Sequence, residues 1–93
     1  MNVKERKDAL VIYRALRKAQ EIFEANETKA SAMLSKIIKI LSEPTSARID
    51  YASIVDENMQ HIERVQKGDI ITIAVFIGST RLIDNYVFGE STH

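Results

Sequence analysis

The side chains that could carry acid–base chemistry in this chain are three aspartates in or beside strand-like segments. Asp50, Asp56 and Asp84 could be imagined as a general acid and base. We expect a structural role instead, because Arg48 and Arg81 occur in the same segments and cross-strand ion pairs would account for Asp50 and Asp84. Asp84 lies in an otherwise apolar run, so its carboxylate must be paired if it is buried.

The remaining side chains give little reason to expect a metal site or a catalytic nucleophile. His61 and His93 have no second histidine or cysteine at a ligand spacing, and the chain contains no cysteine. We expect His61 in a surface loop. Ser79 and Thr80 carry hydroxyls, but no base is placed to activate them and a turn explains them. The sequence therefore predicts no catalytic residue, no metal site and no self-sufficient active site.

A cluster of basic residues, Lys4, Arg6 and Lys7, opens the chain, whose first 18 residues hold six basic and two acidic side chains. Exposed cations near the N-terminus of a helix cost about 0.3–1 kcal/mol each. One explanation is a phosphate group bound nearby. The other is that Glu5 and Asp8 offset these charges and that the region is simply solvated.

Length and composition predict one small domain. The 93 residues are 45% hydrophobic with one proline and three glycines, which is typical of a globular chain. The 13 basic and 13 acidic residues balance, so the whole molecule lacks the charge of a polyanion-binding protein. No apolar stretch approaches the roughly 18–20 residues that span a bilayer, and no signal peptide is recognisable. We expect a cytoplasmic protein without a membrane partner.

The apolar stretch from Asp69 to Phe88 predicts a β-hairpin around which the domain is arranged. Its first half is rich in β-branched residues, and Gly78 suits the first central position of a type II′ turn. We expect the first arm, about Asp69–Ile77, to be the central strand. Arg81 to Phe88 forms the second arm, and Arg48 to Val55 supplies the third strand.

Two amphipathic helices precede the strands. Lys4 to Ala25 repeats apolar residues at three- and four-residue steps, and Lys29 to Ser42 does the same after a possible N-cap at Thr28. The stripe of the first helix comprises Ala9, Ile12, Leu16, Ala19 and Phe23, with Tyr13 beside it. Met59 to Val65 fits either a helical turn or an irregular crossing. The fold class is α+β, with two N-terminal helices packed on one face of a three-stranded antiparallel sheet.

One sheet face remains without a cover in this arrangement. We assign Asp50, Ala52 and Ile54 to it, together with half of the central strand. Such a face is too apolar to be entirely wet, and an exposed apolar patch often marks a partner surface. The chain is therefore expected either to dimerise or to pack against another protein segment.

Several strings, in this order, give the chain a resemblance to a known family. They are ER at 5–6, RIDY at 48–51, IVD at 54–56, IAV at 73–75, Gly78, and TRLIDN at 80–85, the most specific of them. From about Lys4 to Glu90 the chain resembles the C-terminal domain of the pantothenate synthetases, or pantoate–β-alanine ligases. Glu57 stands where family members usually have proline, a change that alters only a turn.

The resemblance implies a lid domain of a longer ligase. Family members are roughly three times longer and carry an N-terminal, Rossmann-like ATP- and pantoate-binding domain, so we expect the natural chain to continue before Met1. The full enzyme joins pantoate to β-alanine through a pantoyl-adenylate, using ATP and Mg²⁺ and releasing AMP and pyrophosphate. The resemblance further implies a homodimer, residues 1–93 as one domain that is inactive alone, and Lys4, Arg6 and Lys7 as candidate contacts to ATP phosphates.

The alternative is a stand-alone α+β module that binds protein or RNA. Recognition of single-stranded RNA on a sheet uses exposed aromatic side chains on which bases stack. Tyr51, Phe76, Tyr86 and Phe88 instead sit in apolar runs. A nucleic-acid partner is therefore not expected.

Overall fold

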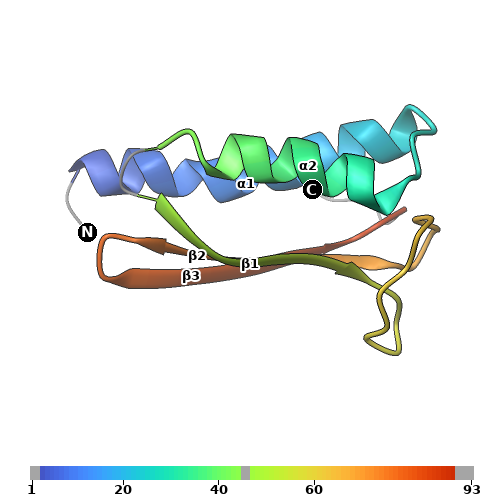
Figure 1. The fold of residues 1–93 in the computed structure, drawn as a ribbon. Coiled ribbons are helices and arrows are strands. Elements are labelled where there is room, and N and C mark those ends of the chain that lie inside the picture. Colours follow the sequence, from blue (N-terminus) through green and yellow to red (C-terminus); the bar gives the residue numbers. More distant parts are fainter. Residues whose placement is uncertain (1–2, 45–46, 90–93) are drawn as a thin grey trace.

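A computed structural model describes residues 3–44 and 47–89 of the chain. His93 and the side chains of Lys4 and Glu5 lie outside the described part. Within it the chain forms two helices and three strands (Figure 1). Their bounds are α1 Val3–Glu24, α2 Ala30–Leu41, β1 Ala47–Val55, β2 Ile70–Ile77 and β3 Thr80–Val87.

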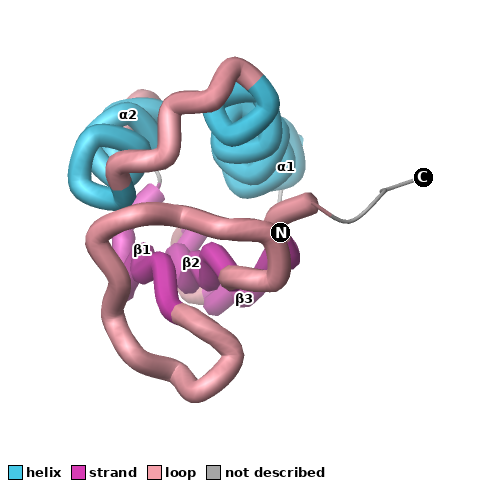
Figure 2. Tube along the Cα trace, turned by 90° about the vertical axis from the view of Figure 1, so that its right-hand side faces the viewer, coloured by secondary structure: helices cyan, strands magenta, loops and turns pink. Residues whose placement is uncertain are grey.

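The described residues form two layers. The strands make an antiparallel sheet in the order β1-β2-β3, so β2 is the central strand. Both helices lie on one face of this sheet and run in opposite directions, as Figures 1 and 2 show. The predicted fold class is confirmed, including the central position of the strand predicted at about Asp69–Ile77.

The hairpin between β2 and β3 is as tight as its sequence predicts. Ile77 pairs with Thr80, which leaves Gly78 and Ser79 as the two turn residues. Gly78 has a positive φ of 60°, whereas the φ of Ser79 is not positive. This combination fits a type II′ turn, whose hand matches the right-handed twist of the flanking strands.

A β-bulge in β1 overturns part of the predicted strand alternation. Ile49 pairs with Val75 and Tyr51 pairs with the next residue, Ala74, so Asp50 is the extra residue. An extra residue switches every following side chain to the opposite face. The assignment of Ala52 and Ile54 to the uncovered face was therefore wrong. Both pack against the core, and Ile54 is 2% exposed.

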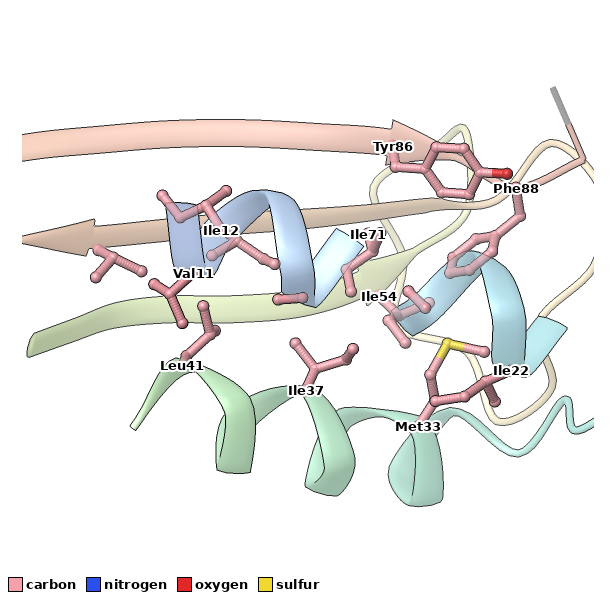
Figure 3. Packing of buried hydrophobic residues seen from close by; sticks show 14 of the residues in the cluster. Val11, Ile12, Ile22, Met33, Ile37, Leu41, Ile54, Ile71, Tyr86 and Phe88 are labelled. Atoms are coloured by element: carbon pink, nitrogen blue, oxygen red, sulfur yellow. The ribbon is translucent and has the colours of Figure 1, made fainter. Parts of the chain in front are cut away.

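The core fills the space between the helices and β2. Ile71, Ile73, Val75 and Ile77 alternate along β2 and all point toward the helices. Figure 3 shows Ile54 among the core side chains, next to residues of α2 and β2. The buried cluster comprises Val11, Ile12, Ala15, Ala19, Ile22, Ala30, Met33, Ile37, Leu41, Ile54, Val65, Ile71, Ile73, Val75, Ile77, Tyr86 and Phe88.

Two details of the helices differ from the prediction. The buried stripe of α1 is centred nearer Ala15 than predicted, because this helix contacts α2 as well as the sheet, and Tyr13 is consequently exposed. Thr28 is not the N-cap of α2, since Lys29 takes that place and makes no side-chain capping bond. The backbone carbonyl of Thr28 instead accepts a hydrogen bond from Val65 at 2.7 Å.

The segment between β1 and β2 is an irregular crossing, one of the two forms left open by the sequence. Ala30 donates its backbone N–H to Glu63 at 2.9 Å, and Val65 is buried beneath the turn between the helices. These contacts tie the turn between α1 and α2 to the sheet. The loop thereby closes the end of the core opposite the hairpin turn (Figure 2).

Candidate functional site

Asp50 and Arg81 form an ion pair that crosses the central strand. Nε and Nη2 of Arg81 donate to Oδ2 of Asp50 at 3.0 and 2.8 Å. The two residues come from β1 and β3; Arg81 pairs with Phe76 of β2, whereas Asp50 is the unpaired bulge residue of β1. The predicted structural pairing of Asp50 is confirmed. The bulge is responsible, because it leaves the Asp50 side chain over the outside of the sheet.

Asp84 does not have the predicted ion-pair partner among the described residues. It is exposed on the side of β3 that faces the helices, and its Oδ1 accepts a hydrogen bond from the backbone N–H of Asn85 at 2.8 Å. Because the carboxylate reaches solvent at the open edge of the sheet, it needs no buried cation. The prediction that an arginine pairs with Asp84 was wrong.

Asp56 organises the turn that follows β1. Its Oδ1 accepts hydrogen bonds from the backbone N–H groups of Asn58 and Gln60, at 2.8 and 3.0 Å. The three aspartates thus lie in three separate places: the outer side of the sheet, the groove beside α1, and a loop. They do not form the pair of carboxylates that acid–base catalysis would use.

His61 lies exposed in the loop between β1 and β2, as predicted. Across residues 3–44 and 47–89, no three His, Cys, Asp or Glu side chains come together as a metal site. Neither described helix has the length and apolarity required to cross a membrane.

Arg6 and Lys7 project into solvent from the first two turns of α1. The side chain of Lys4 lies outside the described part. This start of α1 lies at the same end of the molecule as the turn between β2 and β3 (Figure 1). Arg6 and Lys7 are therefore accessible to a phosphate group from outside the domain.

A groove of about 330 Å³ runs between α1 and β3. Nη1 of Arg17 donates to the hydroxyl of Tyr13 at 3.3 Å beside this groove, and this hydrogen bond is the main cause that raises the pKa of Arg17. Tyr13, Leu16, Arg17, Gln20, Asp84, Asn85 and Tyr86 line the groove. The groove is lined by a cation, Arg17, and by an anion, Asp84. Among its lining residues no nucleophile is paired with a base.

The face of the sheet turned away from the helices is here called the outer face. Neither helix covers it (Figures 1 and 2). In the pairing register its side chains form four rows across the strands. From the hairpin end these rows are Arg48, Phe76 and Arg81; Tyr51, Ala74 and Ile83; Ser53, Thr72 and Asn85; and Val55, Ile70 and Val87.

The two rows nearest the hairpin turn carry the aromatic and the most exposed apolar side chains of the outer face. Ile83 is 54% exposed and Tyr51 is 37% exposed, one on each side of the fully buried Ala74. In the row closest to the hairpin turn, the guanidinium of Arg48 lies 4.8 Å from the ring centroid of Phe76, a cation–π contact. The sequence did not predict this contact, since the register of β1 against β2 has no clear signature in it.

The aromatic residues agree with the argument against an RNA-binding sheet. Tyr86 and Phe88 are buried in the core, where their rings lie 5.4 Å apart at a steep angle. Phe76 is partly covered by Arg48. Of the four, Tyr51 is the most exposed, so the outer face does not present a pair of open rings.

Comparisons with known proteins give one consistent result. Residues 1–87 match the family "Pantoate-beta-alanine ligase". The chain is 43% identical over 88 residues to the pantothenate synthetase of Thermosipho africanus, and 39% identical over 89 residues to that of Clostridium botulinum strain Langeland. These alignments cover 94% and 95% of this chain but 31% and 32% of the relatives.

The fold comparison agrees with the sequence comparison. The crystal structure of the pantothenate synthetase from Thermus thermophilus superimposes with a TM-score of 0.85 at 27% sequence identity. The match covers 94% of this chain and 32% of that one. The chain therefore spans about a third of the length of its relatives, belongs to the pantoate-beta-alanine ligase family, and corresponds to the C-terminal domain of those enzymes.

Proposed function

We propose that this chain serves as the lid domain of an ATP-dependent ligase that joins pantoate to β-alanine. The observation that carries the proposal is the match of nearly the whole chain, in sequence and in fold, to one third of pantothenate synthetases. ATP and Mg²⁺ would bind to the remaining two thirds of such an enzyme. There ATP would activate the pantoate carboxylate as an adenylate, and the amine of β-alanine would displace AMP.

A covering role agrees with what the described residues contain. They form a closed apolar core, and Asp50, Asp56 and Asp84 lie in three separate places. Closure of such a body over a reaction cleft excludes water. Water exclusion matters in this reaction because an acyl-adenylate would otherwise be hydrolysed before the amine attacks. We place the enzyme in the cytoplasm, as a homodimer.

The basic start of α1 would assist the binding of ATP. Arg6 and Lys7 are exposed, so together with Lys4 they can attract a triphosphate over a distance of about one Debye length, roughly 8 Å at physiological salt. They would act by long-range attraction and not as catalytic residues. This role would also account for cations placed at the unfavourable end of the helix dipole.

Domain replacement tests the proposed function. The matched third of the T. africanus enzyme is exchanged for residues 1–93 to give a chimaeric ligase. We expect this chimaera to form pantothenate and AMP from pantoate, β-alanine and ATP, whereas the 93-residue chain alone forms neither. A folded chimaera that forms no pantothenate, or an isolated chain that consumes ATP with both substrates, would contradict the proposal.

The role of the basic cluster is tested in the same chimaera. Lys4→Gln combined with Lys7→Gln should raise the KM for ATP about two- to tenfold at low ionic strength, with a smaller effect at high salt. Lys36→Gln combined with Lys39→Gln removes the same charge from exposed positions of α2 and serves as the control. An equal KM for ATP in the two double variants would contradict the proposed role of the basic cluster.

A further inference from the structure

We propose that the outer face is the surface on which the N-terminal part of the ligase packs. This inference rests on the proposed function, which requires such a part, and adds which of the domain's surfaces meets it. Sheet and helices offer several candidate surfaces: the outer face, the exposed side of α1, and the groove between α1 and β3. Composition, position and area together favour the outer face.

The composition of the two rows nearest the hairpin turn is that of a protein interface. Interfaces are enriched in aromatic residues and Arg and depleted in Lys, Glu, Asp, Ser and Ala. Of the six residues in these rows, four are of the enriched types, Tyr51, Phe76 and two arginines, and Ala74 is the one of a depleted type. Arg81 is held by Asp50 and Arg48 by the ring of Phe76. Both arginines are thus already ordered, which lowers the entropy that a partner must remove on binding.

The outer face is also close to the place where the preceding part of a ligase would be attached. The first turn of α1 lies at the end of the molecule that carries the turn between β2 and β3 (Figure 1). The row of Arg48, Phe76 and Arg81 is the outer-face row next to that turn. A domain joined to the start of α1 can therefore reach these rows without crossing the molecule.

The area of the outer face suits a tethered domain better than a second copy of this chain. Three strands, of nine, eight and eight residues, cover about 27 by 14 Å, or roughly 400 Å². Two such faces in contact would bury about 800 Å², less than the roughly 1,200 Å² of a stable complex between free proteins but within the range of about 600–1,500 Å² for domains of one chain. A tether makes up the difference, because it raises the effective concentration of the partner into the millimolar range.

Thiol labelling tests this surface directly, since the chain has no cysteine of its own. Ile83→Cys places one thiol on the outer face, where the native side chain is 54% exposed, and Ile38→Cys places one on α2, where the native side chain is 42% exposed. Tyr51→Cys is a second reporter in the same row as Ile83. The rate of maleimide labelling at each position is measured by peptide mass spectrometry, in the isolated chain and in the chimaeric ligase.

We expect labelling of Ile83→Cys and Tyr51→Cys to be at least about tenfold slower in the chimaera than in the isolated chain, because a closed interface must open before the thiol reacts. Labelling of Ile38→Cys should change less than about twofold. Equal rates at Ile83→Cys in the two proteins, or slowing at Ile38→Cys instead, would overturn the inference. Slowing at Ile83→Cys that grows with the concentration of the isolated chain would overturn it in favour of a second copy.

Pantothenate formation by the same chimaera separates this inference from the proposed function. A chimaera that forms pantothenate but leaves Ile83→Cys freely reactive refutes the surface and retains the function. A chimaera that protects Ile83→Cys but forms no pantothenate supports the surface and refutes the function.

Discussion

Replacing Ile54 by alanine should destabilise the isolated domain about three times as much as replacing Ile83 by alanine. The two substitutions remove the same atoms from the two edge strands of one sheet. Ile54 is 2% exposed and lies in the core, whereas Ile83 is 54% exposed on the outer face. The comparison therefore isolates burial, which the β-bulge at Asp50 decides for β1.

The magnitude follows from the atoms removed. Deleting the equivalent of three buried methylene groups costs about 2.4 kcal/mol in transfer free energy, and the cavity left behind raises the total to about 3 kcal/mol. At Ile83 a little under half of that transfer term applies and no buried cavity is left, which gives about 1 kcal/mol. A 93-residue domain has about 5–14 kcal/mol of total stability, so both variants should remain folded.

Urea denaturation followed by far-ultraviolet circular dichroism measures the difference. With an m-value near 1 kcal/mol/M, the midpoint should fall by about 3 M for Ile54→Ala and about 1 M for Ile83→Ala. The m-value should be the same in both variants, since the surface exposed on unfolding hardly changes. Equal losses, or a larger loss at Ile83, would show that β1 has the uninterrupted alternation and that Ile54 lies on the outer face.

Three smaller effects follow from individual contacts. In a double-mutant cycle, Asp50→Ala and Arg81→Ala should show a coupling of about 0.5–1 kcal/mol that shrinks in 1 M salt, and a salt-independent value would mean that packing and not charge joins them. Gly78→Ala should lower stability by about 1 kcal/mol because of its positive φ, while Ser79→Ala changes it little; equal effects would argue against the type II′ turn. Asp56→Ala should cost about 1–2 kcal/mol and speed hydrogen exchange at the two backbone N–H groups that the carboxylate holds, whereas unchanged exchange there would mean that the loop orders itself without it.

Local sequence patterns were sufficient for the elements and for the family. The three- and four-residue repeats of the helices, the β-branched run of β2 and the glycine of the hairpin turn each depend on neighbouring residues. The C-terminal end of α1 illustrates the limit of such reasoning. Asn26 terminates the helix with φ of 66°, and the N–H groups of Asn26 and Glu27 bond back to Phe23 and Ile22, a motif that the sequence suggests only as a break.

The outer face could not be predicted from the sequence, because contacts between residues far apart in the chain decide which side chains lie on it. Asp50 meets Arg81 across β2 because a bulge shifts the register of β1, and no local propensity encodes where a bulge falls. Tyr13 is left exposed because α1 must face α2 and the sheet together. The sequence by itself determined the type and order of the elements, since these follow from short-range periodicity. Only the tertiary structure decided which side chains cover the core and which remain on the outer face, because a one-residue change of register exchanges the two faces of a strand.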